Sequence, residues 1–482
     1  MPLILPGNVA SALPTGYSVA NSCRFNKGDT AYMHKTTSAG NRKTWTYSTW
    51  FKRISLGTQV TFGLVQANTA NDNIMAVQLV AANTMDIWDY NGGMSAQITT
   101  NRVFRDVGSW YHVVLAVDTT DSTANNRMRL YINGVEERGA GGYSTDTMPA
   151  EDYTFNINVA DKALKLGVYD YGSVSSPADF YLAETVFIDG TQYAASDFGE
   201  FDEDSPTIWK PKDVSGLTFG TNGFYLDYED SANLGNDANG GTDLTEVNLA
   251  ATDQSADTPT LNYPTWNSNT LLGGAVAVYS EGNLKSVQPS GGASKSISNI
   301  GVSTGKWYIE VKQTAVSNPL GNGEQLIGVI SDSFTYNTSA LDNAMNYSYV
   351  LRNYNGTKSE NGSSGTGWHG DWTAGDIIGI GLDMDNHRVY FSKDGSWADG
   401  DGNWDESSPS GYLTLSSVPT FYFVCAGTQH STAGGTYEIN SGSPSYANSS
   451  DAADANGYGA FEFAPPSGYL AINSANLGSD GG

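Results

Sequence analysis

Four side chains that carry oxygen ligands alternate along one short acidic stretch, ADGDGNWDESS. They are Asp399, Asp401, Asn403 and Asp405. Oxygen atoms at every second position match the spacing of a calcium loop, but an EF-hand would need Gly at its sixth place and Glu at its twelfth. Trp404 and Ser410 stand at those two places. We weigh a calcium site against a solvated acidic turn, and the ligand count favours the turn.

Aromatic side chains stand out in the glycine-rich stretch NYNGTKSENGSSGTGWHGDW and in the loop that follows it. The candidates for ligand binding are Tyr354, Trp368, His369, Trp372 and Trp397. Sugars bind by stacking their apolar CH faces on indole rings, while amides and carboxylates take their hydroxyl groups. The alternative for Trp368 and Trp372 is that their rings close the end of a hydrophobic core.

Side-chain patterns for catalysis are weak in this sequence. Glycoside hydrolysis needs two carboxylates on one face at a defined separation. Glu184 and Asp189 differ in parity along their segment, and the acidic run 202–204 lies in a proline-bounded loop. The five histidines are scattered, and no pair has the i,i+2 or i,i+4 spacing of a metal site. We expect that the protein is not an enzyme, and a glycan-degrading enzyme is the alternative from another class.

The segment GDIIGIGLDMDNHRVYFSKDG, at residues 375–395, alternates between two kinds of side chain. It comes just before Trp397 and must therefore position that ring. By the period-two rule of a strand, one face takes the apolar residues Ile378, Ile380, Leu382, Val389 and Phe391. Arg388 and Tyr390 fall on the opposite face. The pattern predicts a β-hairpin with one buried face, closed by a tight Asp-Gly turn.

A second hairpin is predicted far upstream, from SWYHVVLAV at 109–117 and RMRLYING at 127–134, where Met128, Leu130 and Ile132 form one apolar stripe. Its W-Y-H-V…L-Y-I-N-G pattern resembles laminin-G-like (concanavalin-A-like) jelly rolls. The downstream hairpin resembles the signature of SPRY domains. The two resemblances imply an all-β fold class, with two antiparallel jelly-roll β-sandwiches joined by an irregular acidic connector.

The predicted domain boundaries follow shifts in composition along the chain. Prolines and small residues without periodicity predict an extended N-terminal arm over 1–20. The laminin-G-like sandwich is expected over 21–199. Asp, Asn, Gly and Pro dominate 200–267, which therefore reads as the connector. The SPRY-like sandwich and a C-terminal tail take 268–482.

The formal net charge of −27 limits the classes of partner. Repulsion between acidic side chains and phosphate argues against nucleic acid and against anionic membranes. Cys23 and Cys425 stand alone, so no disulfide framework is predicted. The first residues, MPLILPGNVASALPTG, have no basic n-region, and prolines interrupt their apolar run. We expect neither a secretory signal peptide nor membrane insertion.

The order of arm, laminin-G-like domain, acidic connector, SPRY-like domain and GYLAINSANL tail resembles a class of virion fibre or appendage proteins of marine bacteriophages. The resemblance implies a virion structural protein (tail fibre, knob or decoration), made in the host cytoplasm and displayed on the external surface or tail. Its implied partners are other virion proteins, further copies of itself, most simply as a trimer, and host cell-surface polysaccharide. A purely architectural decoration or spacer is the alternative within this class. No cofactor is expected apart from the calcium considered above.

Overall fold

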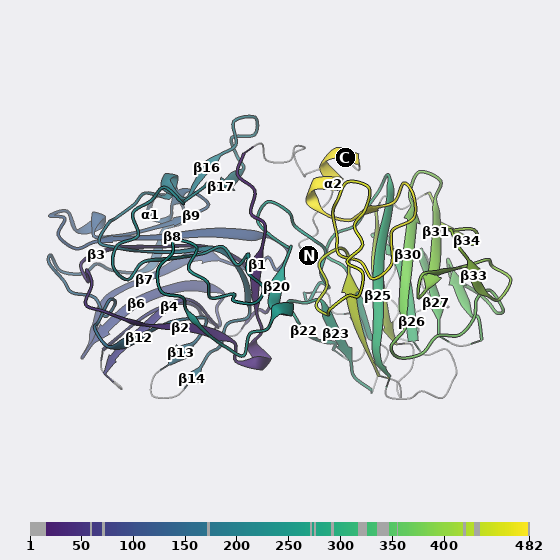
Figure 1. Cartoon of the computed structure of the whole chain (residues 1–482), viewed down its shortest axis with the longest axis horizontal. Helices are drawn as coiled ribbons and strands as arrows, with labels where there is room; N and C mark the ends of the chain where they lie inside the picture. Colours follow the sequence, from purple (N-terminus) through teal and green to yellow (C-terminus); the bar gives the residue numbers. More distant parts are fainter. Residues whose placement is uncertain are drawn as a thin grey trace. The chain divides into compact units, whose positions relative to one another are not determined.

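The computed structural model describes residues 16–57, 60–69, 73–170, 174–269, 272–273, 276–290, 294–316, 325–334, 347–353, 355–417, 421–428 and 434–480. The chain divides into two compact units, Pro14–Thr260 and Leu261–Gly482, which we call the first and the second unit (Figure 1). Each contains two large sheets with a hydrophobic core between them. The predicted all-β class with two sandwiches is confirmed.

Two antiparallel sheets form the first unit. Across one sheet the strands are β10 (Val135–Glu136), β9 (Met128–Ile132), β8 (Trp110–Asp118), β3 (Thr44–Arg53), β15 (Phe180–Asp189), β1 (Ser22–Phe25) and β20 (Gln254–Ser255), and β18 (Phe224–Leu226) also pairs with β15. Across the other they are β11 (Tyr143–Thr147), β7 (Met94–Val103), β6 (Thr84–Asn91), β5 (Asn73–Leu79), β4 (Val60–Thr69), β12 (Lys162–Leu166), β2 (Tyr32–Thr37) and β19 (Thr245–Val247).

The upstream hairpin predicted from the sequence is the pair β8–β9. Met128, Leu130 and Ile132 are buried in the core between the two sheets, as their spacing predicts. Trp45 and Phe51, on the neighbouring β3, are fully buried in the same core. The alternation of apolar residues therefore fixes which face of this sheet is covered.

The side chain of Glu184 departs from that alternation because β15 contains a β-bulge. The register of β15 against β3 shifts between Ala183 and Val186, and Glu184 has φ +49°. Leu182 and Phe187 both face the core, whereas Val186 packs in a separate cluster outside it. The period-two rule, which places Val186 in the core with Leu182, is therefore wrong beyond the bulge.

The predicted boundary at residue 199 moves to Thr260 in the structure. Most of the stretch expected to be a free connector adds strands to the first unit, because β18, β19 and β20 pair with β15, β2 and β1. The end of the predicted arm also belongs to this unit. Val19 is buried, and its N–H donates to Thr260 Oγ1 at 3.0 Å. Residues 1–15 lie outside the described residues.

Two sheets also form the second unit. One runs β21 (Leu272–Gly273), β24 (Ser294–Ile297), β35 (Tyr422–Thr428), β26 (Gln325–Ser331), β27 (Ser348–Arg352), β28 (Lys358–Glu360) and β29 (Ser363–Gly365). The other runs β22 (Val278–Ser280), β23 (Lys285–Gln288), β36 (Gly435–Asn440), β25 (Lys306–Val316), β30 (Ile377–Asp383), β31 (Arg388–Lys393), β32 (Ser396–Ala398) and β33 (Trp404–Glu406). In addition, β34 (Tyr412–Thr414) pairs with β31, and β37 (Leu470–Ala471) pairs in parallel with β25.

Short elements complete the fold. The remaining strands form two ribbons, β13 (Tyr169–Asp170) with β14 (Val174–Ser175) and β16 (Gly199–Phe201) with β17 (Trp209–Pro211). The helical segments are η2 (Lys27–Asp29), η3 (Ala124–Asn126), α1 (Glu137–Ala140), η4 (Ala195–Asp197), η5 (Ala251–Asp253) and α2 (Ser474–Asp480). None of the helices in the described ranges has the length and apolar character that a bilayer crossing requires.

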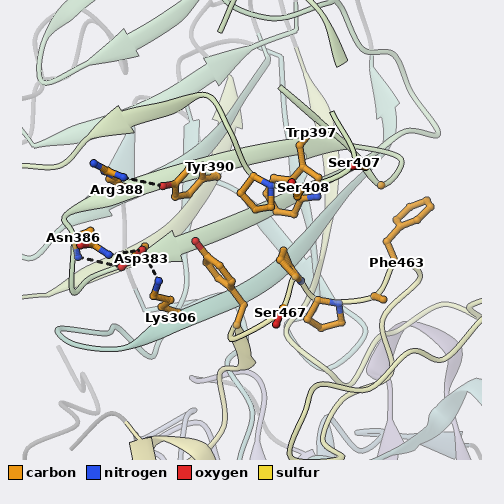
Figure 2. Close-up of a pocket in the computed structure, with 16 residues that line it drawn as sticks. Lys306, Asp383, Asn386, Arg388, Tyr390, Trp397, Ser407, Ser408, Phe463 and Ser467 are labelled. Carbon is orange, nitrogen blue, oxygen red and sulfur yellow. Dashed lines mark hydrogen bonds and ion pairs between the residues drawn. The ribbon is translucent and has the colours of Figure 1, made fainter. Parts of the chain in front are cut away.

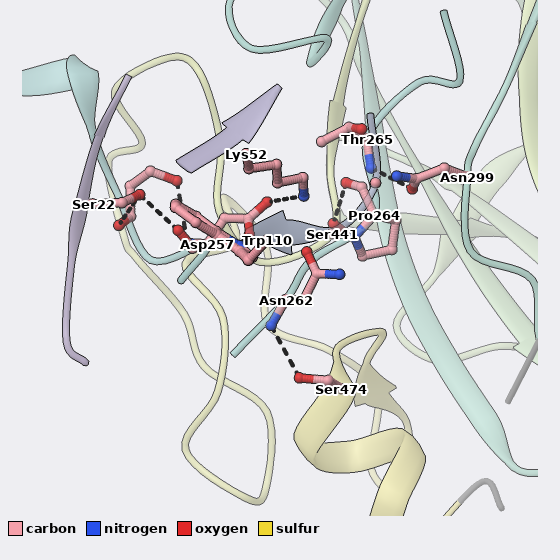
Figure 3. Close-up of polar contacts among 12 residues, drawn as sticks. Ser22, Lys52, Trp110, Asp257, Asn262, Pro264, Thr265, Asn299, Ser441 and Ser474 are labelled. Atoms are coloured by element: carbon pink, nitrogen blue, oxygen red, sulfur yellow. Dashed lines mark hydrogen bonds and ion pairs between the residues drawn. The ribbon is translucent and has the colours of Figure 1, made fainter. Parts of the chain in front are cut away.

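On each side of the boundary at residue 260, polar contacts fix the chain to its own unit (Figure 3). In the first unit, the Asp257 carboxylate accepts hydrogen bonds from Lys52 Nζ at 2.6 Å and from Trp110 Nε1 at 3.0 Å. In the second unit, the Asn262 N–H donates to Ser474 Oγ at 3.0 Å. The buried ion pair of Lys52 and Asp257 anchors the end of the predicted connector to the first sandwich.

Candidate functional site

A pocket with a volume of about 720 Å³ opens on the outer face of the second unit, over β25, β30 and β31 (Figure 2). Its lining comes from residue 306, from 383–397, from the loop 407–409 and from the tail 463–469. The lining residues are Lys306, Asp383, Asn386, Arg388, Tyr390, Gly395, Trp397, Ser407, Ser408, Pro409, Phe463, Ala464, Pro465, Pro466, Ser467 and Tyr469.

The floor of the pocket follows from the alternation of β30. Its apolar residues face the core, and its glycines face outward. A Cβ atom at Gly381 would lie 3.2 Å from the Trp397 ring and 3.3 Å from that of Tyr469. Glycine therefore lets the two rings lie against the strand, where they join Tyr390 in an aromatic cluster on the outer face. The narrow exposed edges of this largely buried cluster form the apolar floor of the pocket.

One end of the pocket is polar. Asp383 ends β30, and its carboxylate forms an ion pair with Lys306 Nζ at 3.0 Å. Asn386 Nδ2 donates to the same carboxylate at 2.9 Å. Burial raises the pKa of Asp383, but the hydrogen bonds from Asn386 and Lys306 outweigh it and hold that pKa below its ordinary value. The Asp383 carboxylate is therefore ionised and already satisfied by protein groups.

Arg388 begins the next strand and lies at the same polar end (Figure 2). Its guanidinium lies over the Tyr412 ring, 4.1 Å from the ring centroid, and its Nη1 donates to the Tyr390 hydroxyl at 3.5 Å. Two tyrosines thus orient the group without neutralising it.

The C-terminal tail forms the apolar wall opposite. Phe463 N–H donates to Glu310 Oε1 at 2.8 Å, and Glu462 N–H donates to Glu310 Oε2 at 3.0 Å. The Tyr308 hydroxyl and Asn440 Nδ2 also donate to this carboxyl group. Burial raises the pKa of Glu310 to about 7, although all these donors act to lower it. One buried side chain of β25 therefore fixes the wall of the pocket.

The aromatic residues singled out from the sequence do not form one site in the structure: one lines the pocket, and others lie in the core. Trp397 lines the pocket, but its ring is only 5 % exposed. Trp368 and Trp372 are buried in the core of the second unit, and Trp372 Nε1 donates to Gln313 Oε1 at 2.7 Å. His369 is also buried, with its ring 5.4 Å from that of Trp372. Tyr354 lies outside the described residues.

The burial of Trp368 and Trp372 agrees with the alternative weighed above, in which they close the end of the core. Trp368 is 8 % exposed, and its ring meets that of the core residue Phe391 edge-on. Neither residue is among those that line the pocket. The glycine-rich stretch belongs to the sandwich, because its short strands β28 and β29 extend the sheet from β27. A role in binding for this group stays a prediction.

The acidic stretch considered for calcium forms a turn. Asp399 Oδ1 accepts the Asp401 N–H at 2.6 Å, which is a local side-chain-to-backbone bond. Asp401, Asn403 and Asp405 are exposed. Over the described residues, no group of three or more His, Cys, Asp or Glu side chains is placed to hold a metal ion.

Sequence reasoning missed most of the pocket. It placed Arg388 and Tyr390 on the outward face of the hairpin, but gave neither a role, and it did not single out Lys306, Phe463 or Tyr469. A signal was present in the outward-facing glycines of β30, because an outer face with no side chains of its own leaves room for rings from elsewhere.

A serine and a histidine lie at hydrogen-bond distance in the first unit. His112 Nε2 lies 2.9 Å from Ser48 Oγ, but Trp209 Nε1 donates to His112 Nδ1 at 2.9 Å. Nδ1 is therefore the acceptor, so Nε2 carries the proton and donates to Ser48 instead of accepting its proton. Burial lowers the pKa of His112 to about 3. This buried pair cannot act as nucleophile and base.

Comparisons with known proteins bear on each unit. Residues 26–165 match the family model described as the concanavalin A-like lectin/glucanases superfamily, and residues 306–400 match that of the SPRY domain. No curated protein matches the chain.

Among solved structures, the human HERC1 SPRY domain is 18% identical, with a TM-score of 0.28, over 36% of this chain and 96% of that one. Domains LG4-5 of the mouse laminin α1 chain are 9% identical, with a TM-score of 0.27, over 86% of this chain and 85% of that one. A heptameric SAP-like pentraxin from Limulus polyphemus is 14% identical, with a TM-score of 0.28, over 37% and 80%. The two family matches show that residues 26–165 are similar to a concanavalin-A-like lectin/glucanase domain and that residues 306–400, further along the chain, are similar to a SPRY domain.

Proposed function

We propose that the protein is a non-enzymatic glycan-binding protein and that the pocket of its SPRY domain holds the glycan. The observation that carries this proposal is the lining of that pocket. An aromatic floor that includes Trp397 and Tyr469 lies beside hydrogen-bonding groups of Lys306, Asn386 and Arg388. A sugar ring presents the complementary surfaces, an apolar CH face and a rim of hydroxyl groups.

Binding is favoured over hydrolysis by the carboxylates. Glycoside hydrolysis uses a pair of them, one as acid and the other as base or nucleophile. Asp383 is the one carboxylate among the described lining residues, and it is held by Lys306 and Asn386. The description of the family matched by residues 26–165, in the first unit, names both lectins and glucanases. The pocket lies in the second unit, and its own lining supports binding.

A pocket-filling variant tests the proposal. Ser408 lines the pocket and is exposed, so Ser408→Trp places an indole into the space without removing a core contact. The matched control is Ser122→Trp, at an exposed turn of the first unit. On an array of bacterial surface polysaccharides, the parent chain and Ser122→Trp should bind the same glycans, and Ser408→Trp should lose them. Equal binding by all three proteins would place the glycan elsewhere, and no release of reducing sugar is expected from any of them.

We further propose that the protein belongs to a phage virion, as a tail fibre, knob or decoration, and contacts polysaccharide on the host surface. The support is the order of its domains and its GYLAINSANL tail, together with lectin-like folds suited to adhesion. A homotrimer and contacts with other virion proteins belong to this proposal. Purified particles labelled with antibody against the chain, and light scattering of the isolated protein, test location and copy number separately.

A further inference from the structure

Arg388 differs from two other arginines in the way it is neutralised. Arg129 lies over the Tyr131 ring at 5.2 Å, and Arg138 lies over the Tyr143 ring at 4.9 Å. Both also form two-pronged ion pairs, Arg129 with Glu136 and Arg138 with Asp146. Arg388 has the tyrosine stack, but within the described residues it has no carboxylate at ion-pair distance.

The nearest candidate partner in the fold is already engaged. Asp383 stands directly opposite Arg388 in the register of β30 and β31. Its carboxylate nevertheless turns to Lys306 and Asn386. A chain with 51 acidic and 24 basic side chains thus places at the mouth of a pocket an arginine that forms no ion pair with any described carboxylate.

The net charge of the pocket has the same sign as this arginine. Among its described lining residues, Lys306 and Arg388 are positive and Asp383 is negative, a surplus of one positive charge in a protein of net charge −27. The charged groups gather at one end, while Trp397 and Phe463 lie toward the other (Figure 2). A ligand that matches both ends has an anion attached to a ring with an apolar face.

We propose, on the basis of the glycan-binding function above, that this pocket selects acidic sugars whose carboxylate is attached to the pyranose ring, namely uronic acids. The planar guanidinium fork of Arg388 matches a carboxylate through two parallel hydrogen bonds. The ring of the sugar then covers the aromatic floor. Lys306 adds an attractive charge but stays bound to Asp383, so Arg388 carries the discrimination between acidic and neutral sugars.

Calorimetric titration with a panel of uronate oligosaccharides and their methyl esters tests this inference. The esters keep the sugar ring and lose the charge. The parent protein should bind at least one uronate about tenfold or more tightly than its ester, since a hydrogen-bonded charge pair is lost in the ester. Arg388→Gln should bind both forms equally, at the affinity of the ester. Arg129→Gln should keep the preference, because Arg129 is already paired with Glu136.

Two further measurements test the geometry of the charge pair. The Arg388→Lys variant tests the guanidinium fork, and a sulfated oligosaccharide tests the preference for carboxylate. Lysine keeps the charge but loses the fork, so part of the preference should remain. A sulfated probe that binds as tightly as the uronate would overturn the choice of carboxylate. Equal binding of uronates and esters by the parent protein, abolished by Ser408→Trp, would overturn the inference and leave the glycan-binding function standing. Thermal melting of each variant confirms that it is folded before titration.

Discussion

The Tyr225 hydroxyl donates a 2.8 Å hydrogen bond to Glu184 Oε2 inside the first unit. Tyr17, at the start of the described chain, donates to the same oxygen at 3.1 Å. Glu184 is 5 % exposed and sits on the bulge of β15. Burial raises the pKa of Glu184 to about 8, although the two tyrosine hydroxyls act to lower it. The carboxyl group is therefore protonated in the folded state at neutral pH.

This pKa predicts how stability depends on pH. Between the ordinary value of 4.5 and about 8, the folded state binds a proton at Glu184 that the unfolded state has lost. The free energy of unfolding must then fall as pH rises through that window. Glu184→Gln removes the titration and keeps an acceptor for Tyr225. Below pH 4.5 we expect the variant and the parent to have the same melting temperature. At pH 8 the melting temperature of the variant should be higher than that of the parent, by about 2–4 °C for each kcal/mol gained.

The exposed Glu203 provides the control for this experiment. Glu203→Gln should follow the parent melting curve at every pH. A constant difference in melting temperature between Glu184→Gln and the parent, from acid to pH 8, would show that Glu184 titrates normally.

The buried Glu310 side chain holds the wall of the pocket by hydrogen bonds, so its replacement should loosen that wall. Its two carboxyl oxygens accept the N–H groups of Phe463 and Glu462. Glutamine has one acceptor oxygen, so Glu310→Gln leaves one N–H unpaired and costs about 1–3 kcal/mol. The amides of residues 462 and 463 should exchange hydrogen faster, and glycan affinity should fall. Glu406→Gln, at an exposed position, should change neither. Unchanged exchange in Glu310→Gln would mean that the tail is held by other contacts.

A variant of Trp368 distinguishes a role of this ring in core packing from a role in ligand binding. Its ring lies in the core of the second unit, so Trp368→Ala should cost about 3–5 kcal/mol, as truncation of a buried tryptophan does. Glycan binding per folded molecule should stay normal, as measured at a temperature where the variant is folded. Phe201→Ala, which removes a ring that is 42 % exposed, should cost far less. A stable Trp368→Ala variant with weakened binding would instead support the ligand role that the sequence suggested.

Salt should stabilise the protein, because its charge of −27 repels itself in the compact state. We expect the melting temperature to rise with sodium chloride. Calcium chloride at matched ionic strength tests the acidic turn that includes Asp399 and Asp401. A further rise that is specific to calcium, and lost in Asp401→Ala, would identify that turn as a calcium site.

The parts of the fold that the sequence predicts well are long strands with one covered face. The hairpin predicted from 109–117 and 127–134 agrees with β8 and β9, and the hairpin at 375–395 agrees with β30 and β31. Period two is visible over such lengths. The strands β18, β19 and β20 escape it because each has two or three residues and belongs to the first sandwich only through its pairing partner. For this reason the segment 200–267 looked like a connector in the sequence.

The pocket escaped prediction for a different reason. The charged end of the pocket comes from neighbouring strands, but its apolar wall comes from the tail 463–469, far along the chain. The buried carboxyl group of Glu310 holds that tail against the sheet. No local pattern encodes that contact. The sequence left the burial of Trp368 open, because glycine-rich sequence is typical of both open loops and chains that fold tightly against a core.

A crystal structure of the protein with a glycan selected on the array tests the central claim most directly. The account predicts a sugar ring over Trp397 and Tyr469 in the pocket of the SPRY domain, with its polar groups toward Arg388. A glycan bound in the first unit, with this pocket filled only by solvent, would contradict it.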